Sequence, residues 1–104
     1  MKNFADRLID AIRAKKSRVV VGLDPRLEAL PEEFRHGTSK DIERAGKAIL
    51  EFNAALIEIV KDHAVAVKPQ VAFYEKLGPY GMAAYFATLK HARDNGLLVV
   101  GDVK

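Results

Sequence analysis

Apolar residues recur along the chain at two kinds of spacing, which together predict helices alternating with strands. A spacing of three to four residues indicates amphipathic helices over roughly the first fifteen residues, over 42–59 and from residue 82 onward. The positions that carry this spacing are Phe4, Leu8, Ile9 and Ile12, then Ile42, Ala45, Ile49, Phe52, Leu56 and Ile59, then Met82, Tyr85, Phe86 and Leu89. The first helix is expected to bury one apolar stripe. A continuous run rich in β-branched residues at 19–23 predicts a strand covered on both faces, and 64–67 and 97–103 are interpreted as a second and a third strand.

Residues with special backbone preferences predict where these elements end. Thr38 and Ser39 are candidate caps for the second helix, because their hydroxyls can accept hydrogen bonds from its first amides. One helical turn is expected around 73–77, and Gly78-Pro79 should end it, since a residue before proline disfavours helix. Asn95-Gly96 should stop the last helix.

Strands that alternate with helices predict an α/β fold made of right-handed parallel crossovers. Three parallel strands alone would leave both outer strands with unpaired backbone groups. The sequence is therefore expected to be the first part of a larger fold. A TIM (β/α)8 barrel takes about 250 residues, so residues 1–104 are interpreted as its incomplete N-terminal portion, with three strands and their flanking helices.

Composition narrows the class of protein without identifying a function. The chain is 49% hydrophobic and 30% charged, which is typical of a folded globular protein. Its net charge is only +3. The sequence shows no basic face with interleaved aromatic residues, which disfavours nucleic-acid binding. The absence of cysteine fits a reducing compartment. No apolar stretch approaches the ~20 residues of a membrane span, and no signal peptide is recognisable, so we expect a cytoplasmic protein.

All three predicted strands end in charged residues. Asp24 follows the first strand, Lys68 follows the second, and Asp102 and Lys104 end the third. The last two are two residues apart, so their Cα atoms should lie roughly 6.5 Å apart on one face of the strand. In parallel α/β folds, ligands bind beyond the carboxyl ends of the strands. We therefore expect these two anions and two cations to converge into a preorganised electrostatic site.

Each of these residues also has a plain structural interpretation. Asp24 followed by Pro25 resembles a helix N-cap with proline at the first helical position. Lys68 could extend from a strand end into water, and 102–104 could be a solvated strand end. Their occurrence at three equivalent strand ends favours a common site. Tyr74 and Tyr85 are interpreted as packing residues, and the three histidines show no metal-ligand spacing.

Four stretches of the sequence resemble one enzyme family. They are VGLDPR at 21–26, Phe52-Asn53, KPQVAFYE at 68–75 and LLVVGDVK at 97–104. In order and spacing they are similar to orotidine 5′-phosphate decarboxylase, in particular to its bacterial group with a KPQ-x-AFYE segment. The resemblance implies a dimeric (β/α)8 barrel that converts orotidine 5′-phosphate into uridine 5′-phosphate in de novo pyrimidine biosynthesis, with no metal or organic cofactor.

The resemblance also implies a role for each charged strand-end residue. Asp24 would hydrogen-bond the ribose hydroxyls, and Lys68 would bridge the ribose and Asp102. Asp102 would lie beside the substrate carboxylate, and Lys104 would protonate the ring carbon that loses carbon dioxide. The family motif continues Asp-x-Lys-x-x-Asp beyond Lys104, so the 104-residue chain alone is expected to be inactive and to need the remaining part of the barrel.

Two alternatives remain open at the level of sequence. One is a magnesium-dependent sugar-phosphate decarboxylase or aldolase of the same superfamily, which shares the Asp-x-Lys pattern. Those relatives place an acidic metal ligand where this chain has Lys68, so a cation there disfavours a divalent metal. The other is a non-catalytic half-barrel that binds a nucleotide or a partner protein.

Overall fold

The computed structural model describes residues 3–35, 37–38 and 40–100. Helices and strands alternate along this part of the chain, with three short helical segments between the main elements. In chain order they are α1 (Phe4–Lys15), β1 (Val19–Leu23), the 3-10 turn η1 (Leu27–Ala29), α2 (Glu32–Arg35), α3 (Ile42–Val60), β2 (Ala64–Pro69), α4 (Val71–Glu75), α5 (Gly78–Asp94) and β3 (Leu98–Val99).

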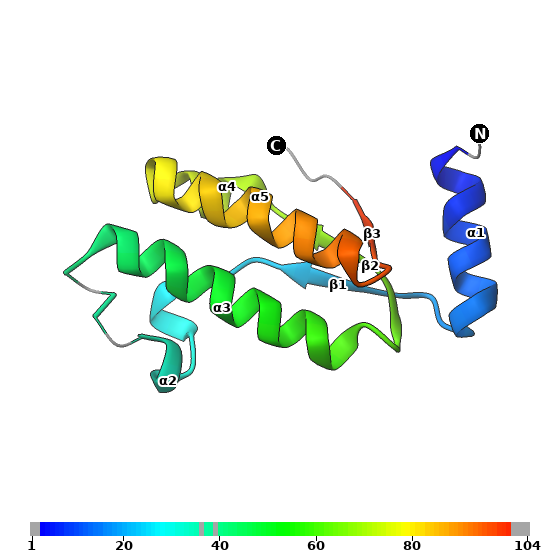
Figure 1. Cartoon of the computed structure of the whole chain (residues 1–104), viewed down its shortest axis with the longest axis horizontal. Helices are drawn as coiled ribbons and strands as arrows, with labels where there is room; N and C mark the ends of the chain where they lie inside the picture. The colour runs from blue at the N-terminus through cyan, green and yellow to red at the C-terminus, as the bar shows by residue number, and fades with distance from the viewer. Residues whose placement is uncertain (1–2, 36, 39, 101–104) are drawn as a thin grey trace.

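The strands form a parallel sheet, as the sequence predicts, and their order is β1-β2-β3. The long helices α3 and α5 lie beside each other along the sheet (Figure 1). The main core fills the space between these helices and the sheet, where Leu23, Ile57, Val67, Ala92 and Leu97 are buried together. The three-strand, helix-flanked architecture is thus confirmed.

A second core cluster joins α3, α4 and α5 around Ile49, Tyr74, Tyr85 and Leu89. Glycine permits the close approach of these helices. A Cβ on Gly81 of α5 would overlap the main-chain oxygen of Tyr74 in α4. The short helix α4, which follows β2 after a single residue, is therefore held tightly against α5.

Helix α1 stands at one end of the molecule, away from α3 and α5 (Figure 1). Its predicted existence is confirmed, with Asn3 as the N-cap. The prediction of a buried stripe is wrong for this structure, because no residue of α1 is buried. The helix is joined to the body by Lys15, whose Nζ donates to the main-chain oxygens of Lys61 and Ala64, each at 2.8 Å.

Several predicted boundaries are corrected by the structure. Helix α3 is capped by Asp41, whose side chain accepts hydrogen bonds from the amides of Glu43 and Arg44. Thr38 instead donates its hydroxyl proton to the main-chain oxygen of Arg35, and Ser39 lies outside the described residues. Strand β2 runs on to Pro69, so Lys68 lies within it. Only 98–99 of the predicted strand 97–103 are seen as β3, and 101–103 lie outside the described residues.

Candidate functional site

Asp24 directly follows β1 and Lys68 lies near the end of the adjacent strand β2, so both are at the carboxyl ends of the parallel strands. In the β1–β2 register, Gly22 pairs with Lys68 and Leu23 pairs with Pro69. Asp24 follows Leu23 directly, and its carboxylate lies back over Gly22. A Cβ built on Gly22 would be 3.7 Å from Asp24 Oδ2. Neighbouring strands are about 4.8 Å apart. The carboxylate therefore lies over the residue that faces Lys68 across the ladder.

Both side chains are exposed rather than buried. The main chain around them is buried, since Leu23, Pro25, Val67 and Pro69 flank them on either side. The pair therefore stands at a solvent-accessible rim on a rigid base. Both charged groups are therefore accessible to a ligand at the carboxyl ends of β1 and β2.

The alternative interpretation of Asp24 as a helix cap is wrong, because η1 begins at Leu27 and its N-cap position is occupied by Arg26. Asp102 and Lys104 lie outside the described residues. Of the four predicted site residues, the structure thus places Asp24 and Lys68. The convergence of all four stays a prediction.

A buried polar network supports the β1 end of this rim. Tyr74 in α4 donates its hydroxyl proton to the main-chain oxygen of Leu23 at 2.9 Å. The same hydroxyl accepts a hydrogen bond from Asn53 Nδ2 at 3.0 Å, and this amide also donates to Thr88 Oγ1 at 3.2 Å. Four elements, β1, α3, α4 and α5, are therefore joined through one phenol and one amide.

The direction of the bonds in this network is set by its chemistry. The Leu23 oxygen can only accept, so Tyr74 must donate to it, and the Asn53 amide must then donate to Tyr74. Within the described part of the chain, the remaining Asn53 Oδ1 is buried without a hydrogen-bond partner. Burial raises the pKa of the Tyr74 hydroxyl, a hydrogen bond from Asn53 partly offsets this, and the nearby charge of Asp24 raises the pKa further. Tyr74 therefore keeps its proton at neutral pH.

The sequence-based interpretation of Tyr74 as a packing residue is correct, but it misses the polar role of the hydroxyl. The sequence feature that could have indicated this hydrogen-bond network is Asn53. It is a polar residue within an apolar helical stripe, four positions after Ile49 and four before Ile57, which are both buried. An asparagine at such a position requires buried partners.

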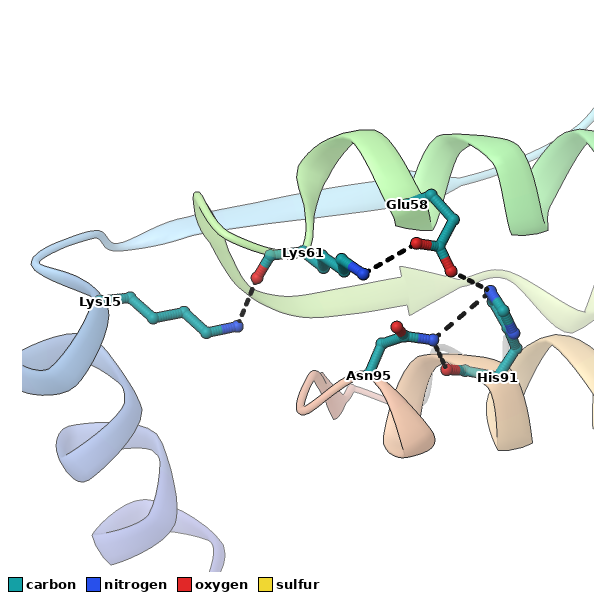
Figure 2. A network of polar contacts seen from close by, with 5 residues as sticks. All are labelled: Lys15, Glu58, Lys61, His91 and Asn95. Carbon is teal, nitrogen blue, oxygen red and sulfur yellow. Dashed lines mark hydrogen bonds and ion pairs between the residues drawn. The ribbon is translucent and has the colours of Figure 1, made fainter.

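A second polar cluster lies at the opposite end of the sheet (Figure 2). Lys61 Nζ contacts Glu58 Oε2 at 2.8 Å, and His91 Nε2 contacts Glu58 Oε1 at 3.3 Å. Asn95 Nδ2 donates to the main-chain oxygen of His91, which caps the end of α5, and Lys15 reaches the main-chain oxygen of Lys61. The bond from Lys61 is the main cause of a lowered pKa at Glu58. Partners at helix ends indicate a structural role for this cluster.

Among residues 3–35, 37–38 and 40–100, no three histidine or acidic side chains are grouped to hold a metal ion. The helices of this same part of the chain are too short or too polar to cross a membrane.

Comparison with known proteins gives one consistent result. The chain is 41% identical over 105 residues to an orotidine 5′-phosphate decarboxylase of Rhodopirellula baltica, covering 100% of the chain and 35% of that protein. An enzyme of the same name from Clostridium kluyveri is 38% identical over 99 residues. The chain is homologous to orotidine 5′-phosphate decarboxylases. No protein-family model matches it.

Solved structures agree with these homologues. The chain superimposes with a TM-score of 0.75 and 28% identity on a Streptomyces avermitilis protein described as an orotidine 5′-phosphate decarboxylase, covering 100% of the chain and 34% of that protein. UMP synthase of Leishmania donovani gives a TM-score of 0.74 at 33% identity, with 19% of that protein covered. The neighbours are TIM barrels of which a part is matched, and the chain spans about a third of the length of its curated relatives.

Proposed function

We propose that residues 1–104 form the N-terminal part of an orotidine 5′-phosphate decarboxylase, a carboxy-lyase of de novo pyrimidine biosynthesis. The active protein would be a cytoplasmic homodimer in which the remaining part of the barrel supplies the contacts to phosphate and pyrimidine. The observation that carries this proposal is the pair Asp24 and Lys68 at the carboxyl ends of β1 and β2, in a chain homologous to these enzymes along its whole length.

In the proposed reaction, Asp24 accepts hydrogen bonds from the ribose hydroxyls, and Lys68 bridges the ribose and Asp102. Asp102 lies beside the substrate carboxylate, so its repulsion is relieved as the carbon–carbon bond breaks and carbon dioxide departs. The electron pair of that bond stays on the ring carbon. The ammonium group of Lys104 stabilises this charge and then donates its proton to the carbon, which yields uridine 5′-phosphate.

The proposal is tested by measuring carbon dioxide release from orotidine 5′-phosphate with the protein that includes the rest of the barrel. Lys104→Ala should lower turnover by more than the 10²- to 10⁴-fold attributed to a general acid, because the lysine also stabilises charge. Lys68→Ala should also abolish activity. Lys90→Ala is the matched control, since Lys90 is an exposed lysine of α5 that pairs with Asp94. Turnover near wild type in either of the first two variants would refute the mechanism.

The same barrel-containing protein distinguishes the enzymatic proposal from the alternative of a non-catalytic binding fragment. Calorimetric binding of uridine 5′-phosphate without any decarboxylation would support that alternative and overturn the enzymatic proposal.

A further inference from the structure

The buried network of Asn53, Tyr74 and Thr88 lies directly behind the rim that carries Asp24. Tyr74 is fully buried, and its hydroxyl holds the main-chain oxygen of Leu23, the residue immediately before Asp24. This hydrogen bond crosses 51 positions of sequence and connects α4 to the end of β1. The main chain just before Asp24 is thus held by a contact from α4 in addition to the pairing of Leu23 with Pro69 in the sheet.

The turn after β1 is held against α4 by a second contact. The guanidinium of Arg26 lies 5.5 Å from the centre of the Phe73 ring, a distance typical of a cation–π contact. Arg26 and Leu23 therefore fix the turn on either side of Asp24, through adjacent aromatic residues of α4. Asp24 itself is exposed, so its carboxylate can meet a ligand while the backbone beneath it stays fixed.

Tyr74 is in turn held in place by contacts from two helices, α3 and α5. Asn53 of α3 donates to its hydroxyl, and Gly81 of α5 lies so close to its main-chain oxygen that no side chain fits between them. The ring of Tyr85 packs edge-on against it with centroids 5.1 Å apart. These contacts leave the Tyr74 hydroxyl one position from which to donate to Leu23. The packing of α3 and α5 around Tyr74 therefore affects the turn at Asp24.

We propose that Tyr74, oriented by Asn53, is a positioning residue that fixes the carboxylate of Asp24 for recognition of the vicinal ribose hydroxyls of the nucleotide. This inference rests on the proposed function and adds to it a source of sugar specificity. A ligand whose sugar lacks one hydroxyl loses the interaction with Asp24, so precise placement of that carboxylate separates ribonucleotides from deoxyribonucleotides.

The test compares the affinities of the barrel-containing protein for uridine 5′-phosphate and 2′-deoxyuridine 5′-phosphate by calorimetry. Tyr74→Phe removes only the hydroxyl that donates to the Leu23 oxygen. We expect the preference for the ribonucleotide to fall about tenfold, the effect of losing one hydrogen bond from a ribose hydroxyl to the charged Asp24 carboxylate. Asn53→Asp is the second variant. A carboxylate accepts the Tyr74 proton and draws it from Leu23, so the same loss of preference is expected.

Two controls separate positioning from general destabilisation. Tyr85→Phe removes the hydroxyl of a neighbouring buried tyrosine that is not part of the network. This variant should keep the sugar preference even where stability falls. In the background Asp24→Ala, Tyr74→Phe should have no further effect on the preference, because the two substitutions act through one carboxylate.

The possible results distinguish this inference from the proposed function. A wild-type protein that binds neither nucleotide and releases no carbon dioxide would refute both. An active wild type whose Tyr74→Phe or Asn53→Asp variant folds and keeps the full preference for ribose would refute the positioning role alone. Equal losses in Tyr85→Phe and Tyr74→Phe would also refute it.

Discussion

The close approach of α5 to α4 at Gly81 gives a stability prediction that can be worked from distances. An alanine methyl at this position would overlap the main-chain oxygen of Tyr74 and lie 2.9 Å from both Leu77 Cβ and the Tyr74 carbonyl carbon. Ordinary contact begins at 3.4 Å, so α4 and α5 must separate by at least about 0.5 Å at these carbons and further at the oxygen. Because the most severe overlap is with the main-chain oxygen of Tyr74, a side-chain rotation cannot relieve it.

The size of the effect follows from two opposing contributions. Alanine in a helix interior is favoured over glycine by about 1 kcal/mol. Overpacking against a well-packed neighbour costs about 1–3 kcal/mol, and the upper end applies when backbone must move. Gly81→Ala should therefore lower the free energy of unfolding by about 2 kcal/mol, which corresponds to a fall in Tm of roughly 8–16 °C for a domain of this size.

Urea unfolding followed by far-UV circular dichroism measures this change. Ala83→Gly, at an exposed position of the same helix, is the calibration and should cost about 1 kcal/mol through helix propensity alone. If Gly81→Ala raised stability by a similar amount, the glycine would have no packing role and the described contact between α4 and α5 would be wrong.

Three further predictions concern the core, the buried phenol and the proposed chemistry. Ile49→Ala should lower the free energy of unfolding by about 2–5 kcal/mol through cavity formation, whereas Ile59→Ala on the same helix, 72% exposed, should change it by less than about 0.5 kcal/mol; equal urea midpoints would contradict the burial of Ile49. The raised pKa of Tyr74 means that its contribution to stability is present below pH about 10 and is lost at higher pH, where the unfolded tyrosine ionises. The pH dependence above 10 should therefore be weaker in Tyr74→Phe, and parallel curves for the two proteins would exclude this contribution. A chelator should leave decarboxylation by the barrel-containing protein unchanged, and strong inhibition would instead favour the magnesium-dependent alternative.

The sequence predicts the fold better than it predicts the ends of its elements. Apolar spacing is a property of each segment, so the main helices and strands could be inferred without any tertiary information, and their alternation indicated a parallel sheet. The cap of α3 could not, because Thr38, Ser39 and Asp41 all precede the same apolar stripe. The path of the loop decides which of them reaches the first amides, and in the structure it is Asp41.

The sequence predicts which residues form a helix better than it predicts which of their side chains are buried. Phe86 belongs to the apolar pattern of α5 but is 63% exposed, and Ile42 and Ile59 of α3 are also exposed. A helical period shows which side chains share a face. The burial of that face depends on which element packs against it, and this is a tertiary property that no single segment encodes.

The candidate site shows the same division between local and tertiary information. Lys68 is placed by strand register alone, since its position opposite Gly22 follows from the pairing of β1 with β2. Asp24 lies one residue beyond β1, and the hydrogen bond from Tyr74 to Leu23 adds a constraint from α4 to the last paired residue before it. The two residues should therefore respond differently to changes in the helix layer. Substitutions between α4 and α5 should weaken the proposed sugar recognition by Asp24 before they disturb the proposed role of Lys68, because the α4 contact bears on the turn at Asp24 whereas Lys68 lies within the sheet.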